Sequence, residues 1–120
     1  MNYGVDFFWI DYDNINDRTN LRALTHYHFN DFKQITNRRG ITLARNALIA
    51  AHRYPIHYTG ETLVSWKNLE LLPTYNSTAS NLGLSWISND IGGYTDGIED
   101  GELYSRFVQF GCFSPILRLS

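Results

Sequence analysis

Cysteine, proline and methionine are scarce in this chain of 120 residues, which contains one cysteine, three prolines and one methionine. A single cysteine, Cys112, excludes an internal disulfide and fits a reducing compartment, so we expect a cytoplasmic protein. Because Cys112 lies in an apolar run at residues 110–113, we expect its thiol to be buried and unreactive. No apolar run approaches the roughly 18 residues of a membrane span, and residues 1–6 lack the basic and apolar regions of a signal peptide.

An excess of charge of one sign is also lacking. Ten Lys and Arg residues stand against twelve Asp and Glu residues, which gives a formal net charge of −2. Such a chain has no field that would attract nucleic acid or anionic lipid, so we expect neither a nucleic acid nor a membrane as a partner. Arg38 and Arg39 form the one adjacent basic pair, and we expect them in a solvated loop.

The chain is nonetheless rich in core-forming residues, with 43% apolar and 15% aromatic residues, which supports one globular domain over residues 1–120. Short apolar runs alternate with segments of helical spacing, a pattern that predicts an α/β fold with a parallel sheet and right-handed crossovers. The first strand has continuous apolar character and should be buried on both faces. Pro73 should kink or split the second helix. We expect strands over residues 5–10, 41–44, 56–58, 84–88 and 114–119, and helices over residues 21–35, 62–79 and 102–110.

Polar side chains follow the first four predicted strands, close to the point where each strand ends. They are Asp11, Arg45, Glu61 and Asp90, in strand order. The carboxyl ends of parallel strands meet at one edge of a sheet, where α/β enzymes build their pockets. Two carboxylates in such a pocket, Asp11 and Glu61, indicate cleavage of a glycosidic bond.

This placement favours a barrel of the (β/α)8 type over a sandwich. A complete barrel needs about 250 residues, and the chain supplies about half of that length. We therefore expect a partial TIM barrel, present as a fragment. An open half-barrel leaves strand edges and an apolar inner face uncovered, so self-association or a complementary barrel segment is expected as a partner.

An ordered series of motifs runs through almost the whole chain. The motifs are Val5-Asp6-Phe7-Phe8-Trp9-Ile10-Asp11, Leu43-Ala44-Arg45, His52-Arg53-Tyr54-Pro55, Gly60-Glu61-Thr62 with Ser65-Trp66, Asn89-Asp90-Ile91-Gly92-Gly93 and Phe113-Ser114-Pro115-Ile116-Leu117-Arg118. In this order they resemble glycoside hydrolase family 31, the α-glucosidase and α-xylosidase group of retaining enzymes. The resemblance implies a carbohydrate substrate, and it implies that the chain corresponds roughly to strands four to eight of the family barrel.

The resemblance also implies roles for the candidate residues. Asp11 matches the family's catalytic nucleophile, which forms a covalent glycosyl-enzyme. Glu61 stands where the family has its acid/base, normally an aspartate, and its extra methylene displaces the carboxyl by about 1.5 Å. A displacement of that order can cost roughly 100-fold in rate. Arg45, Arg53 and Asp90 match positions in the sugar pocket, where the guanidinium of Arg53 would offer a fork of donors to hydroxyl groups.

Ordinary structural roles remain open for each of these residues. Asp11 could cap the loop that follows it, and Glu61 could lie in the first turn of the next helix, where a carboxylate is favourable. Four aromatic side chains could bind sugar rings by stacking, although core packing is the commoner role for each. They are Trp9, Trp66, Trp86 and Phe113.

Neither a cofactor nor a metal site is expected. His26 and His28 lie two positions apart on a predicted helix, so their side chains point in different directions and do not chelate. A sugar-binding histidine of the family would fall near position 120, where this chain has Ser120. Together with Glu61, this departure leaves an alternative open: a catalytically inactive half-barrel module that binds carbohydrate or self-associates.

Overall fold

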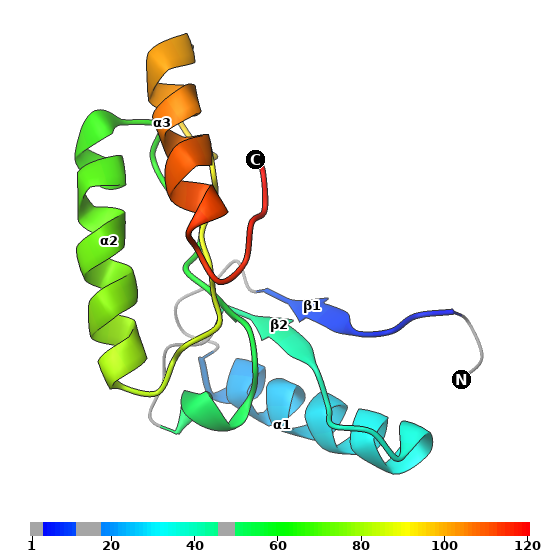
Figure 1. Cartoon of the computed structure of the whole chain (residues 1–120). Helices are drawn as coiled ribbons and strands as arrows, with labels where there is room; N and C mark the ends of the chain where they lie inside the picture. The colour runs from blue at the N-terminus through cyan, green and yellow to red at the C-terminus, as the bar shows by residue number, and fades with distance from the viewer. Residues whose placement is uncertain (1–3, 12–17, 46–49) are drawn as a thin grey trace. The chain divides into compact units, whose positions relative to one another are not determined.

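The computed structural model describes residues 4–11, 18–45 and 50–120, and the chain divides into two compact units, Met1–His57 and Tyr58–Ser120. Figure 1 labels the helices α1, α2 and α3 and the strands β1 and β2. Short parallel strands alternate with helices, so the predicted α/β fold with parallel strands is confirmed. None of the helices in the described part of the chain is long and apolar enough to cross a membrane.

The first unit is built on two parallel strands and the helix that connects them. Its elements are β1 (Phe8–Ile10), α1 (Arg18–Thr36), β2 (Thr42–Ala44), the 3-10 helix η2 (Ala51–Arg53) and the start of β3 (His57–Tyr58). Phe8 pairs with Thr42 and Ile10 with Ala44, and Ala44 pairs in the same direction with His57. The helix α1 packs against β1 and β2 (Figure 1). The helix predicted over residues 21–35 is therefore confirmed.

The strand β1 is less buried than its sequence predicts. Ile10 is 4% exposed and packs with Leu21 and Ala44 in the core of this unit. Phe8 and Trp9, in contrast, are 42% and 49% exposed, so the prediction of a strand buried on both faces is wrong. Trp9 points to the opposite face of β1 from Ile10, and within this unit α1 covers only one face of the strand. Phe8 lies on the same face as Ile10, with its ring 4.8 Å from that of His28 on α1, but remains only partly covered.

The second unit is built on two helices that lie side by side (Figure 1). They are α2 (Trp66–Asn81) and α3 (Gly101–Cys112), with β4 (Ile87–Ser88) between them in the chain. Their core consists of Leu72, Ile91, Leu103 and Phe107, none more than 3% exposed. Leu103 and Phe107 are four residues apart and therefore share one face of α3. The helix predicted over residues 102–110 is confirmed.

The start of α2 differs from the prediction. The hydroxyl of Ser65 accepts a hydrogen bond from the Asn68 N–H at 3.2 Å and caps the helix, which therefore begins at Trp66 and not at residue 62. Pro73 lies inside α2, which is one continuous helix, so the split does not occur and a kink stays a prediction. The Ser77 hydroxyl donates to the Pro73 carbonyl at 2.7 Å.

Two further predictions near the end of the chain are wrong. Residues 114–119 form no strand, but two isolated parallel bridges, Ser88 to Ile116 and Ile91 to Leu119. Cys112 is exposed and not buried. It is the last residue of α3, and the buried face of that helix is formed by Leu103, Phe107 and Gly111.

Candidate active site

In the first unit, Asp11 and Arg45 lie next to each other at the carboxyl ends of β1 and β2. The parallel register pairs Ile10 with Ala44, and the Arg45 N–H donates to the Ile10 carbonyl at 3.1 Å. This brings Nη1 of Arg45 to 3.6 Å from Oδ1 of Asp11. Both side chains remain partly accessible, at 37% for Asp11 and 31% for Arg45. A carboxylate with its charge balanced by a neighbouring guanidinium is thus presented at the edge of the sheet where such enzymes react.

Arg53 belongs to the same unit, where it ends η2 with its side chain exposed. The segment enters η2 through Ala50, whose φ of 71° lies in the left-handed region. The Tyr54 hydroxyl lies 2.7 Å from Nδ1 of His26 on α1, which fixes this segment to the helix. Arg53 is therefore carried by a short, anchored segment, and a contact between Arg53 and a sugar stays a prediction.

In the second unit, Glu61 lies in the loop between β3 and α2. Gly60 precedes it with a φ of 92°, and the Glu61 side chain is exposed. Because α2 begins at Trp66, Glu61 is not in a first helical turn, and that alternative role is wrong. The loop is held on both sides of Glu61: the Thr59 N–H donates to Ser88 at 3.2 Å, and the Thr62 carbonyl accepts from Tyr94 at 2.8 Å.

Asp90 lies in the same unit and is completely buried. Its Oδ1 forms an ion pair with Nη2 of Arg118 and accepts a hydrogen bond from the Ser120 hydroxyl at 3.3 Å. Its Oδ2 accepts from the Tyr58 hydroxyl at 3.3 Å. The guanidinium of Arg118 also lies over the Tyr58 ring, 4.8 Å from its centroid, and donates to the Ser88 hydroxyl at 3.2 Å. A buried carboxylate needs this degree of compensation, because an unpaired charge in the interior is costly.

The buried carboxylate also reaches the loop that carries Glu61. The Thr62 N–H donates to Oδ2 of Asp90 at 3.1 Å, so the residue directly after Glu61 is held by the network. Arg118 is not among the residues predicted for the site, although a guanidinium within the apolar run 115–119 indicates a buried partner. A contact between Asp90 and a sugar stays a prediction.

Trp66 connects the two helices of the second unit at their amino ends. Its indole N–H donates to Oδ2 of Asp100 at 3.2 Å, while Oδ1 of Asp100 accepts from the N–H groups of Glu102 and Leu103 at 2.9 and 3.1 Å. The hydrogen bond from the Leu103 N–H has the largest effect and lowers the pKa of Asp100 below its ordinary value of 3.8. Loss of solvation raises the pKa by less, and the hydrogen bonds from Trp66 and Glu102 lower it further. Stacking of a sugar on Trp66 stays a prediction.

Core packing is not the role of the four aromatic side chains singled out in the sequence. Trp66 is 48% exposed, and the expectation that most of the four pack in the core is wrong. The other exposed fractions are 49% for Trp9, 52% for Trp86 and 93% for Phe113.

Comparison with known proteins decides the family. The family model for the glycosyl hydrolases family 31 TIM-barrel domain matches residues 1–120. The chain belongs to glycosyl hydrolase family 31. The predicted family resemblance is therefore confirmed, and the fold is that of the family's barrel domain; the assignment of strands four to eight stays a prediction.

Relatives of this family 31 chain include a probable alpha-glucosidase of Oryza sativa, 32% identical over 69% of this chain and 9% of that protein. Alpha-glucosidase 2 of Bacillus thermoamyloliquefaciens is 32% identical over 72% of this chain and 11% of its own length. The chain thus spans about a tenth of the length of these relatives.

The fold is also found in a solved structure of the cycloalternan-degrading enzyme from Trueperella pyogenes, in complex with isomaltose. The two share 18% identity with a TM-score of 0.79, over 99% of this chain and 19% of that one. A structure of the same enzyme in complex with a covalent intermediate gives a TM-score of 0.71 at 20% identity, over 88% of this chain and 15% of that one.

Proposed function

We propose that this chain carries catalytic residues of a retaining α-glycoside hydrolase, with Asp11 as nucleophile and Glu61 as acid/base. The observation that carries the proposal is the position of Asp11: an accessible carboxylate at the carboxyl end of a parallel strand, 3.6 Å from the guanidinium of Arg45. Family 31 membership supports the reaction class. Arg45 and Arg53 are proposed as donors to sugar hydroxyls.

The proposed reaction has two steps, formation and hydrolysis of a covalent glycosyl-enzyme. An Asp11 carboxylate oxygen attacks the anomeric carbon while the bond from that carbon to the leaving oxygen breaks, and Glu61 gives its proton to the leaving group. Glu61 then removes a proton from water, and the resulting hydroxide displaces Asp11 from the sugar. Both carboxyl groups return to their initial states, with one bond hydrolysed and no cofactor consumed.

The proposed substrates are α-linked glucosides or xylosides. Two relatives bear the names of alpha-glucosidases, and the cycloalternan-degrading enzyme was solved with isomaltose. Because the chain spans about a tenth of the length of such relatives, we propose that a complementary barrel segment or a second copy of the chain completes the sugar pocket.

The test is covalent labelling of the purified chain by a mechanism-based fluoro-α-glucoside, followed by peptide mass spectrometry. We expect the label on Asp11, hydrolysis of an aryl α-glucoside or α-xyloside, and loss of both in Asp11→Asn. Asp6→Asn is the matched control, because Asp6 is exposed and precedes the same strand that Asp11 follows. A folded chain that carries the label on another residue would contradict the assignment of Asp11, and a folded chain with neither label nor hydrolysis would favour an incomplete or inactive module.

A second candidate function is carbohydrate binding without catalysis. The observation that favours it is Ser120, which stands near the place of the family's sugar-binding histidine and donates instead to the buried Asp90 at 3.3 Å. Isothermal titration with isomaltose distinguishes the two functions. Saturable binding with neither hydrolysis nor labelling would support the binding module, whereas turnover would exclude it.

A further inference from the structure

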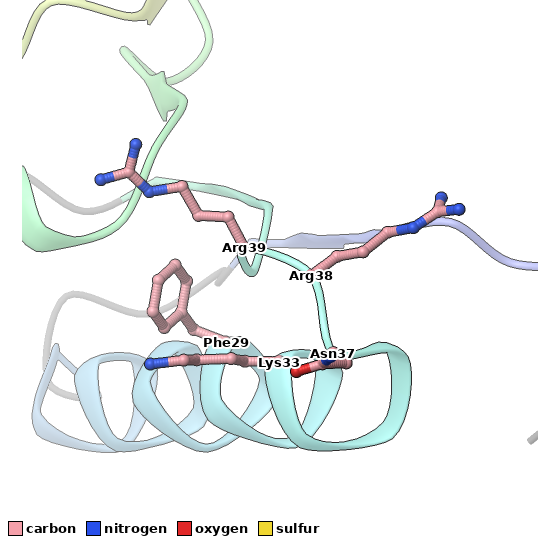
Figure 2. A pocket seen from close by; sticks show the side chains of 5 residues that line it. All are labelled: Phe29, Lys33, Asn37, Arg38 and Arg39. Carbon is pink, nitrogen blue, oxygen red and sulfur yellow. The ribbon is translucent and has the colours of Figure 1, made fainter.

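A hollow outside the candidate active site lies at the carboxyl end of α1. It has a volume of about 490 Å³ and is lined by Phe29, Lys33, Asn37, Arg38 and Arg39 (Figure 2). Hollows of roughly 300–1,000 Å³ are the size that proteins use for small ligands. The lining contains three cationic side chains and no carboxylate, in a chain whose net charge is negative.

The turn that forms one wall of this hollow is held in place by contacts with α1. Asn37 directly follows the last residue of α1 with a φ of 52°, and the Arg38 N–H donates to the Thr36 hydroxyl at 3.2 Å. Gly40 lies so close to the helix that a Cβ there would come within 2.4 Å of the Phe29 carbonyl oxygen and 2.7 Å of its ring. The arginines are therefore carried by a fixed turn against Phe29.

Two of the three cations lie on the same side of the hollow. In Figure 2 the side chains of Lys33 and Arg39 extend to the same side as the Phe29 ring, one from the helix and the other from the turn, while Arg38 extends away from both. Within residues 4–11, 18–45 and 50–120, neither Lys33 nor Arg39 takes part in an ion pair. Two uncompensated cations beside a half-buried aromatic ring favour an anion attached to a small organic group.

We propose that this hollow binds a phosphate group, free or as the monoester of a small molecule, between Lys33 and Arg39. A phosphate carries close to two negative charges at neutral pH, which matches two donors of this kind. The carboxyl end of a helix repels anions, so binding depends on these side chains and not on the backbone. The turn that forms one wall of the hollow leads into the amino end of β2, whereas Arg45 follows the carboxyl end of that strand. The ligand would therefore not compete with a glycoside beside Asp11.

The experiment is a titration of the isotopically labelled chain with inorganic phosphate, with glucose 6-phosphate and with glucose, followed by nuclear magnetic resonance of the backbone amides. We expect saturable shifts at residues 37–40 with both phosphates and none with glucose. Tighter binding of glucose 6-phosphate would identify a monoester as the ligand, and equal binding would identify free phosphate. Absence of saturation with both, or shifts confined to other residues, would overturn the proposal.

Four variants separate a specific site from general surface charge. Lys33→Gln and Arg39→Gln should each weaken binding about tenfold, because each removes a charge-assisted hydrogen bond. Arg38→Gln should weaken it far less, since that side chain extends away from the site. Arg22→Gln, on the same helix and outside the hollow, should have no effect. Equal weakening by all four variants, in chains whose amide spectra remain folded, would show that only net charge matters and would overturn the proposal.

Discussion

At the scale of single residues, Asp90 is completely buried and its carboxylate is balanced by Arg118. Removal of one partner leaves the other charge in the interior, which typically costs about 3–5 kcal/mol. We therefore expect Arg118→Gln to lower the free energy of unfolding by about 3 kcal/mol or more. In the Asp90→Asn/Arg118→Gln double variant, the free energy of unfolding should fall by less than the sum of the decreases in the two single variants.

Urea denaturation measures these differences, and Arg106→Gln serves as the matched control. Arg106 pairs with Glu102 at 3.5 Å, but the two side chains are 52% and 69% exposed. Such a pair contributes about 0.5 kcal/mol or less. Similar losses of stability in Arg118→Gln and Arg106→Gln would contradict the assignment of Asp90 and Arg118 as an interacting pair. Additive losses of stability in the double variant would also contradict it.

A second prediction at the scale of single residues concerns the length of the Glu61 side chain. If Glu61 is the acid/base in place of the family's usual aspartate, Glu61→Asp draws the carboxyl back by about 1.5 Å. We expect this variant to raise kcat for an aryl α-glucoside by up to roughly 100-fold. Glu99→Asp is the control, because Glu99 is also an exposed loop residue of the second unit. An unchanged or lower kcat in Glu61→Asp would count against the catalytic role.

At the scale of secondary structure, the turn between α1 and β2 depends on the missing side chain of Gly40. An alanine Cβ would lie 2.4 Å from the Phe29 carbonyl oxygen, a backbone atom that cannot move without the helix. We expect Gly40→Ala to lower the free energy of unfolding by about 1–3 kcal/mol. In Gly101→Ala a Cβ would meet nothing within 4 Å at the start of α3, so stability should be unchanged or rise by up to about 1 kcal/mol. Urea denaturation of both variants checks the difference.

The amino end of α3 gives a prediction about pH. Asp100 has its pKa lowered by the Leu103 N–H, so its ionised form stabilises the folded state above the ordinary value of 3.8. This contribution is lost as the pH falls through the lower pKa of the folded state. We expect Asp100→Asn, which accepts hydrogen bonds but does not titrate, to have a flatter dependence of stability on pH below 3.8. Thermal unfolding from pH 6 to pH 3 measures it, and parallel curves for both proteins would contradict the role of Asp100.

At the scale of the whole molecule, the exposed aromatic residues of β1 and the exposed Phe7, which directly precedes it, predict self-association. Phe7, Phe8 and Trp9 are 45%, 42% and 49% exposed, and among the described strands β1 pairs with β2 alone. An apolar strand edge of this kind is a template for another chain. Sedimentation velocity should show an apparent mass that rises with protein concentration. Phe7→Lys should remain monomeric, because a lysine on an edge opposes pairing.

Ile98→Lys is the control for that experiment. Ile98 is 84% exposed but lies in a loop of the second unit and belongs to none of the described strands. It should therefore leave the self-association unchanged. A wild-type chain that stays monomeric at every concentration would exclude self-association, and the complementary barrel segment would remain as the proposed partner.

Local patterns in the sequence determined the alternation of strands and helices, the spans of α1 and α3, and the family. The spacing of apolar residues such as Leu103 and Phe107 indicates which face of a helix is buried. The order of the motifs indicates the family, so both conclusions can be drawn without a structure. The adjacency of Asp11 and Arg45 also followed from the sequence, since residues after parallel neighbouring strands meet at one edge.

Tertiary structure alone decided which side chains are buried and which donors meet each acceptor. Trp9 is apolar but exposed, because burial depends on how many elements cover a strand and not on the residue's own hydrophobicity. Asp90 is polar but buried, because Arg118, Tyr58 and Ser120 arrive from distant parts of the chain to compensate its charge. Contacts of such long sequence separation leave no periodic trace, and for that reason only the folded chain reveals them.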